Sequence, residues 1–271
     1  MREIISDRIK KCVSEFESRE NTKTSWRDPI VGFANVQSDY IQKMQIFLGP
    51  EHELPEDILD DAKIVVAYFL PFTKELVKLS SDKKYEKQHV VAPEWALAYE
   101  ETNTLIVIIN RDLIEFLSQK GYKAAFSIQS MTFDKEKLIS HWSQRHFAYA
   151  AGLGTFGINN MLITKVGCCG RYSTVITNLD VEADQPVEGE YCLYKKKGTC
   201  GICMKHCPAG ALTPDGYDRN ACYGICKENA VVYTDFGSSY MDETGENANS
   251  VGSEVCGKCV TGSPCAIWNL K

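Results

Sequence analysis

The chain has 271 residues, 44% of them hydrophobic, and a formal net charge of -6 at neutral pH. This length fits one large or two modest domains with a proper core, and the acidic balance argues against a broad phosphate-binding face. No apolar run approaches the roughly 20 residues that a bilayer crossing needs, and the opening residues MREIISDRIKK lack the apolar segment of a signal peptide. We therefore expect a cytoplasmic protein without membrane association.

Hydrophobic patterning in the first part of the chain predicts alternating helices and strands. Helices are expected at 3–19, 93–121 and 135–151. Strands, indicated by β-branched and aromatic runs, are expected at 30–34, 63–70 and 122–128. This alternation predicts an α/β fold, a sheet with packed helices, followed by a cysteine-rich module. The polar stretch 180–190 marks the expected boundary between a domain at 1–183 and a second at 184–271.

Directly after the predicted helix 135–151, the run Gly152-Leu153-Gly154-Thr155-Phe156-Gly157 matches the dinucleotide pattern G-x-G-x-x-G. A Rossmann fingerprint requires a strand before this pattern and a helix after it. Here a helix leads in and an apolar run follows. We therefore interpret the run as a turn whose glycines let the backbone approach something flat or bulky.

Eleven of the twelve cysteines lie within residues 168–271. The spacing Cys200-x2-Cys203-x3-Cys207-Pro208 is typical of two-cluster ferredoxins, in which the Cys before the Pro ligates the other cluster. Position 197, where the usual run has a Cys, is Lys, so Cys192 is the expected substitute. The ligands predicted for a first [4Fe-4S] cluster are Cys192, Cys200, Cys203 and Cys265. Those predicted for a second cluster are Cys207, Cys222, Cys256 and Cys259. The domain at 184–271 is therefore expected to be a ferredoxin-like module with two [4Fe-4S] clusters, and the α/β domain at 1–183 is expected to bind the other cofactor and the substrate.

Three alternatives compete with iron–sulfur ligation. Paired Cys-x2-Cys knuckles also build closed zinc sites. Disulfides are a second alternative, which an intracellular location disfavours. Some cysteines are expected to be small buried apolar side chains, and Cys12 and Cys226 are the candidates for this role.

The run Gly167-Cys168-Cys169-Gly170-Arg171 is open to two interpretations. The two thiols could flank a tight strand entry, one pointing each way. Alternatively, a thiol between Gly and Arg could be an accessible thiolate with a low pKa, facing a cofactor pocket. The candidate catalytic residues are Asp134, His141, Cys168 and Cys169.

The segment 141–164, with Ala-Gly-Leu-Gly-x-x-Gly-x-Asn at 151–159, resembles the epoxyqueuosine reductases, as do Asp218-x3-Cys222 and Cys256-x2-Cys259. The resemblance implies an α/β corrinoid-binding domain joined to a module with two [4Fe-4S] clusters. It also implies that the clusters pass single electrons to a cobalamin, which reduces a substrate. The residues that it places at the cofactor are Gly152, Gly154, Gly157 and Asn159.

The expected electron donor is a low-potential protein such as ferredoxin or flavodoxin. A small-molecule substrate is expected rather than tRNA, because the C-terminal helical extension that would assist tRNA binding is missing from this sequence. Two other functions stay open: a corrinoid-free electron-transfer protein that docks to a partner, and a small flavin-linked reductase.

Overall fold

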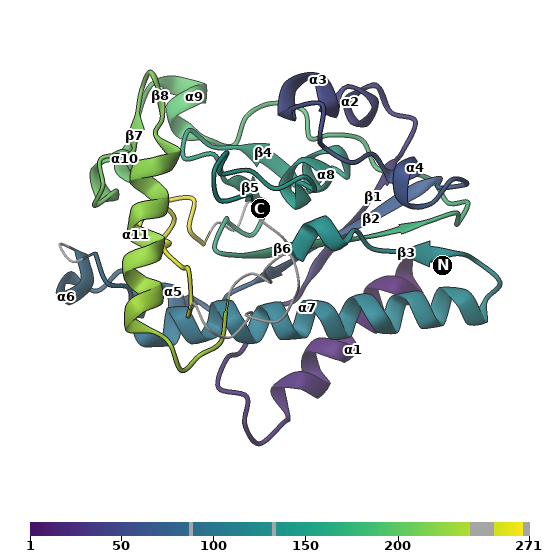
Figure 1. The fold of residues 1–271 in the computed structure, drawn as a ribbon, viewed down its shortest axis with the longest axis horizontal. Coiled ribbons are helices and arrows are strands. Elements are labelled where there is room, and N and C mark those ends of the chain that lie inside the picture. The colour runs from purple at the N-terminus through teal and green to yellow at the C-terminus, as the bar shows by residue number, and fades with distance from the viewer. Residues whose placement is uncertain (87–88, 132–133, 239–251, 268–271) are drawn as a thin grey trace.

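The computed structural model describes residues 1–86, 89–131, 134–238 and 252–267. Its centre is a four-stranded antiparallel sheet with the strand order β1-β2-β6-β3. The strands are β1 (Ile30–Asn35), β2 (Ile64–Pro71), β3 (Ala124–Ala125) and β6 (Gly170–Thr177). The long helix α7 (Pro93–Gln119) crosses one face of the sheet together with α1 (Arg2–Glu17), and α8 (Gln144–Ala150) covers the other (Figure 1).

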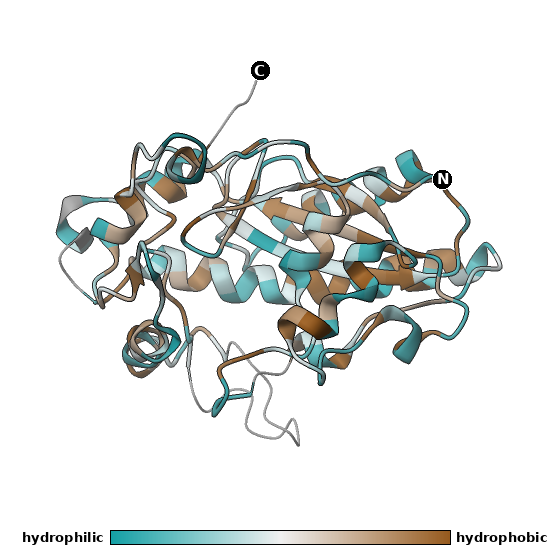
Figure 2. Ribbon diagram, turned by 90° about the horizontal axis from the view of Figure 1, so that it is seen from above, coloured by the Kyte–Doolittle hydropathy of each residue, from teal (hydrophilic) through white to brown (hydrophobic). Residues whose placement is uncertain are grey.

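Strand β2 shows why the sheet is covered on both faces. All eight of its residues are buried, and successive side chains point to opposite faces. Val66 and Tyr68 belong to the core shared with α1 and α7, whereas Val65 and Phe69 belong to the core shared with α8. A strand buried on both faces reads as one continuous apolar run, which is the pattern seen in the sequence. In Figure 2 much of the hydrophobic colour accordingly falls on the elements at the centre of the molecule.

Shorter elements fill the rest of the described chain. Those of the α/β part are α2 (Asp39–Gln42), α3 (Met44–Leu48), α4 (Pro55–Ile58), α5 (Lys74–Ser80), α6 (Lys83–Glu86), a 3-10 turn at Ile128–Met131, and the hairpin of β4 (Gly154–Phe156) and β5 (Leu162–Thr164). Those of the cysteine-rich part are α9 (Leu193–Lys197), α10 (Ile202–His206), β7 (Leu212–Thr213), β8 (Gly216–Tyr217) and α11 (Arg219–Val232). In the described parts of the chain, no helix combines the length and the apolar character of a membrane span.

Most of the predicted elements are confirmed. The helices expected at 3–19 and 93–121 correspond to α1 and α7, and the strands expected at 30–34 and 63–70 correspond to β1 and β2. The predicted fold class, a sheet with packed helices followed by a cysteine-rich module, is also confirmed. The strand expected at 122–128 is much shorter than predicted, because only Ala124–Ala125 pairs with β6.

The helix predicted at 135–151 is wrong over its first half. The described residues 134–143 form turns, and helix α8 begins only at Gln144. Two features prevent a longer helix. Asp134 and Ile139 form an isolated β-bridge, and Leu138 has a left-handed backbone with φ 54°. A bulky residue in this conformation cannot continue a right-handed helix.

The cysteine-rich part shares a hydrophobic core with the α/β part. Cys192, Val255 and Val260 belong to the same core cluster as residues of α1, β2 and α7. The Trp95 indole on α7 also donates a hydrogen bond to the carbonyl oxygen of Cys256, at 3.0 Å. The boundary predicted at residue 183 stays a prediction, and the two parts that it separates are packed together.

Candidate functional site

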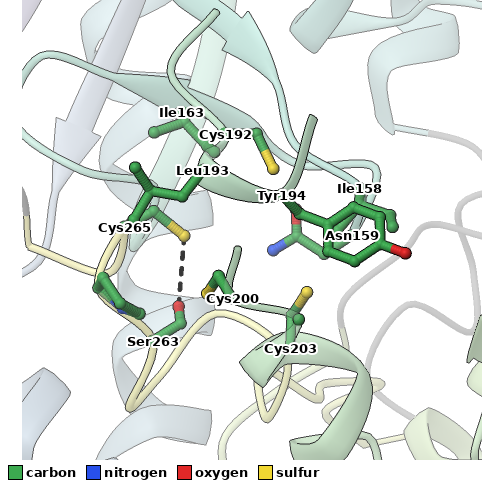
Figure 3. A pocket seen from close by; sticks show the side chains of 12 residues that line it. Ile158, Asn159, Ile163, Cys192, Leu193, Tyr194, Cys200, Cys203, Ser263 and Cys265 are labelled. Atoms are coloured by element: carbon green, nitrogen blue, oxygen red, sulfur yellow. Dashed lines mark hydrogen bonds between the residues drawn. The ribbon is translucent and has the colours of Figure 1, made fainter. Parts of the chain in front are cut away.

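Four cysteine side chains line one cavity in the cysteine-rich part (Figure 3). Cys192 caps the N-terminus of α9, Cys200 precedes α10, and Cys203 lies within α10. Cys265 reaches the cavity from the C-terminal segment. These are the four residues that the spacing assigns to the first cluster, so the fold gathers them from separate segments. Their role as ligands stays a prediction.

The backbone at Cys200 is in an unusual conformation. Its φ is 110°, which is rare for any residue with a side chain. The flanking Gly201 also has a positive φ, of 87°. Such strain persists only where the surrounding structure imposes it, and it is concentrated at functional sites. Cys200 is also exposed, whereas Cys192 and Cys203 are buried.

Hydrogen bonds attach the Cys192 loop to the glycine-rich hairpin. The hydroxyl of Thr155 on β4 donates to Oε1 of Glu190 at 3.0 Å and accepts the backbone N–H of Tyr191 at 2.9 Å. The same Glu190 oxygen accepts the backbone N–H of Cys192 at 2.9 Å. Strand β4 therefore fixes the position at which the first cysteine enters the cavity.

Asn159 connects the hairpin to both predicted ligand sets. It is only 5% exposed, and its side chain lines the cavity beside Cys192 and Cys203 (Figure 3). Its Nδ2 donates to the carbonyl oxygen of Cys259 at 3.3 Å, and its Oδ1 accepts the N–H of Met161 at 3.2 Å. Asn159 is therefore a pocket residue, but the pocket that the structure shows is the one lined by cysteines.

The second predicted set surrounds Cys259. Cys207 ends α10, Cys222 lies in the first turn of α11, and Cys256 lies in the C-terminal segment. Burial raises the pKa of the Cys259 thiol, and the nearby Cys256, Cys222 and Cys207 raise it further. The four thiols are therefore close enough to influence one another electrostatically. Cys203 of the first set also raises the pKa of Cys259, which places the two sets side by side.

The arrangement differs from a site for one metal ion. Within the ranges that the structure describes, no three Cys, His, Asp or Glu side chains form such a site. A zinc ion needs sulfurs about 2.3 Å from one point, whereas a [4Fe-4S] cluster is a bulky group held by four thiolates. Cysteines around a cavity suit the larger group. All twelve cysteines lie in the described residues and are free thiols there.

The glycines at 152–157 pack against other parts of the chain. A Cβ on Gly154 would lie 2.0 Å from the carbonyl oxygen of Ile163 on β5, and one on Gly152 would lie 2.4 Å from that of Gln185. A Cβ on Gly157 would lie 2.5 Å from Oδ1 of Asn159. Close backbone approach therefore does require these glycines, but the neighbours are protein atoms. The glycines do not form an open cradle for a cofactor.

Asp134 and His141 lie in the irregular segment before α8. The Asp134 Oδ1 accepts the backbone N–H groups of Glu136 and Lys137, at 2.9 and 2.8 Å. The bond from Lys137, followed by that from Glu136, lowers the pKa of this carboxyl. The side chain therefore stabilises its own turn as a carboxylate, and its catalytic role stays a prediction. His141 is partly exposed, and its carbonyl oxygen accepts the N–H of Glu53 at 2.9 Å.

Cys168 and Cys169 immediately precede β6, and both are 0% exposed. A hydrogen bond with Cys169, together with burial, raises the pKa of the Cys168 thiol well above its usual value. The interpretation of this pair as an accessible, low-pKa thiolate is therefore wrong, and two buried thiols at a strand entry describe it better. The Sγ of Cys168 lies 3.9 Å from the Sγ of Cys265. No spacing in the sequence indicated this contact, nor that Ser263 lines the cavity.

No family model matches the chain. Two similar curated proteins are both named epoxyqueuosine reductase. The one from Leadbetterella byssophila is 27% identical over 169 residues, which cover 62% of this chain and 49% of the relative. The one from Bacillus anthracis is 24% identical over 248 residues, covering 86% of this chain and 58% of the relative. The chain spans about half the length of the curated relatives it matches.

Solved structures agree with these relatives. Epoxyqueuosine reductase from Streptococcus thermophilus has a TM-score of 0.54 and 19% identity, covering 97% of this chain and 67% of that one. An epoxyqueuosine reductase with an epoxyqueuosine-modified tRNA-Tyr stem loop has a TM-score of 0.53 and 18% identity. The match covers 96% of this chain and 66% of that one. At these identities the likeness shows the fold. The predicted resemblance is thus confirmed: in sequence and in fold, this chain is similar to epoxyqueuosine reductases.

Proposed function

We propose that this protein is an iron–sulfur oxidoreductase of the epoxyqueuosine reductase type, in which two [4Fe-4S] clusters pass single electrons to a corrinoid that reduces a substrate. The observation that carries the proposal is the cavity lined by Cys192, Cys200, Cys203 and Cys265. Four thiolates around one cavity match what a four-iron cluster requires. The likeness to epoxyqueuosine reductases supports the same assignment.

The second set of thiols supports a path for electrons between two clusters. Cys203 and Cys259 belong to different predicted sets, yet their thiols influence each other electrostatically. Asn159 also contacts the cavity of one set and the backbone of the other. Clusters held at these positions would be neighbours, and we propose that electrons enter the first of them on the side of the exposed Cys200. A low-potential donor such as ferredoxin or flavodoxin would deliver electrons there.

The corrinoid part of the proposal rests on the resemblance. A bound corrinoid would supply one-electron chemistry that amino acid side chains lack. The residues that the resemblance places beside it are Gly152, Gly154, Gly157 and Asn159. The space next to these glycines is filled by Gln185, Ile163 and Asn159, so the turn itself shows no cradle for the group. The experiment must therefore test corrinoid binding directly.

For the substrate, we propose a small molecule, in keeping with the formal net charge of -6. A tRNA stem loop is the second candidate, because one similar structure contains it. Two results together would identify tRNA as the substrate. The protein would bind an epoxyqueuosine-modified stem loop at physiological salt, and the epoxide would be lost under reducing conditions. Absence of both would leave the small-molecule class for screening.

The test of the proposal is anaerobic reconstitution with iron and sulfide, followed by EPR with and without added cob(II)alamin. We expect about eight irons per chain, as two four-iron clusters require, and an altered cobalt spectrum. Intact clusters beside an unaltered cobalt signal would instead favour a corrinoid-free or flavin-linked electron-transfer protein. Failure to bind about eight irons would refute the cluster assignment. A Cys12→Ala variant, altered at a buried thiol on α1, is the matched control.

A further inference from the structure

Cys168 belongs to neither predicted ligand set, yet it contacts one of the ligands. It is 0% exposed, and its Sγ lies 3.9 Å from the Sγ of Cys265. The backbone imposes this contact. The N–H of Cys168 donates to the carbonyl oxygen of Cys265 at 3.0 Å, and the N–H of Cys169 donates to that of Ala266 at 3.3 Å. Two parallel backbone hydrogen bonds therefore hold the two thiols side by side.

The residue before Cys168 lets the two segments approach. Gly167 has φ 107°, and a Cβ at this position would lie 2.3 Å from the carbonyl oxygen of Ala266. Any side chain here would push the C-terminal segment away. The Gly-Cys-Cys-Gly run, which the cluster spacing did not explain, thus brings a buried thiol to Cys265.

If Cys265 ligates a cluster, the contact between the two sulfurs becomes a hydrogen bond in which Cys168 donates and Cys265 accepts. A ligating cysteine is a thiolate, and a neighbouring S–H can donate a hydrogen bond to its sulfur. Ser263 is the other polar group nearby, with its Oγ 3.3 Å from the Sγ of Cys265. Its hydroxyl donates to the carbonyl oxygen of Val260 at 2.9 Å. The S–H of Cys168 lies within reach of both Cys169 and Cys265, and a thiolate at Cys265 would be the stronger acceptor.

We propose that Cys168 is a positioning residue of the first cluster, whose S–H donates to the Sγ of Cys265 and raises the reduction potential of that cluster. The inference rests on the proposed function, because it requires a cluster at Cys265. Its physical basis is that the reduced cluster carries one more negative charge than the oxidised one. A hydrogen bond to a ligand sulfur stabilises the reduced form more, and such bonds are one of the factors that set cluster potentials.

The test compares the full-length Cys168→Ala and Cys168→Ser variants with the wild-type protein after anaerobic reconstitution. Two quantities are measured: iron per chain, and the midpoint potential of each cluster by potentiometric EPR titration. We expect both variants to keep about eight irons. In Cys168→Ala the midpoint potential of one cluster should shift to a more negative value. In Cys168→Ser a hydroxyl donor replaces the thiol, so the potential should stay closer to wild type.

Three outcomes would overturn the proposal. Equal potentials in Cys168→Ala and wild type would show that the contact has no effect on the cluster. Loss of about half of the iron in both variants would make Cys168 a ligand rather than a donor. If the alanine variant does not fold, electron–nuclear double resonance of wild-type protein in D2O gives the answer, and absence of an exchangeable hydrogen near the first cluster refutes the donor. If the wild-type protein binds no four-iron clusters, the proposed function itself is wrong. The iron count reveals that outcome independently of the midpoint potentials.

Discussion

Replacing Cys192 with alanine tests the least usual member of the predicted ligand sets. The residue substitutes for a Cys expected at position 197, which is Lys, and the structure brings its side chain into the cavity with Cys200, Cys203 and Cys265. Without Cys192 only three of these thiols remain. We expect the first cluster to be lost, so that iron falls from about eight to about four per chain.

The substitution should remove the cluster without unfolding the chain. Cys192 is 7% exposed, and removing one buried sulfur costs on the order of 1 kcal/mol, comparable to deletion of one or two methyl groups. A domain of this kind is stable by roughly 5–15 kcal/mol. The N–H of Cys192, which bonds to Glu190 at 2.9 Å, is kept in alanine. Iron loss would therefore report ligation rather than misfolding.

Anaerobic iron analysis and EPR provide the assay, with circular dichroism to confirm folding. The matched control is Cys12→Ala, which removes a buried thiol from α1 and should keep about eight irons. Retention of eight irons by folded Cys192→Ala, with an unchanged spectrum, would remove this residue from the ligand set. The cavity geometry would then have no bearing on cluster binding.

Three further predictions concern His52, Cys226 and Gly154. Burial lowers the pKa of His52 from 6.5 to about 4. The folded state therefore favours the neutral imidazole, and its contribution to stability is complete above pH 6.5. As the pH falls, the unfolded chain takes up the proton first, and the free energy of unfolding drops by about 2 kcal/mol at pH 5. Urea unfolding of His52→Gln should show a weaker pH dependence, and an equal dependence would contradict the argument. Cys226, whose hydrogen bond lowers the pKa of Cys222, should be dispensable for iron binding, so Cys226→Ala should keep about eight irons. Gly154→Ala should lower the unfolding free energy by roughly 1–3 kcal/mol, because its Cβ would meet the Ile163 carbonyl at 2.0 Å. Gly224→Ala, with open space around it, should be neutral or stabilising in thermal unfolding.

Elements with a strong local pattern could be predicted from the sequence, whereas those determined by tertiary contacts could not. Strand β2 and helix α7 carry long apolar patterns that have few other interpretations. Strand β6 was not predicted, because it reads Gly-Arg-Tyr-Ser-Thr-Val-Ile-Thr although its last six residues are buried. Its polar side chains find distant partners: Ser173 bonds to Asn110, and Thr174 accepts the indole N–H of Trp142 at 2.9 Å. Only the fold supplies these partners.

The candidate site likewise contains some residues that the sequence predicted and some contacts that only the fold determines. Cysteine spacing predicted which four residues would line one cavity, because iron–sulfur chemistry constrains the separation of ligands along the chain. The neighbours of those cysteines come from segments with no such constraint. Cys168, which lies 97 residues before Cys265, is brought to it by backbone pairing. Asn159 was predicted as a pocket residue, but its bond to the Cys259 carbonyl depends on how the hairpin packs.

Hydrogen bonds behind the cysteine loops attach them to the helices α7 and α11. On α7, Trp95 bonds to the carbonyl oxygen of Cys256, and Glu100 accepts the hydroxyl of Ser253 at 2.6 Å. On α11, Asn229 accepts the N–H of Val91 at 2.9 Å. Helix α7 also packs on the central sheet, so the loops that carry Cys256 and Cys259 rest on the same helix as the sheet. If Cys256 and Cys259 ligate a cluster as proposed, loops fixed in this way would lose little conformational freedom when the cluster binds. Rapid single-electron transfer requires a site that reorganises little, and anchoring to α7 would favour it.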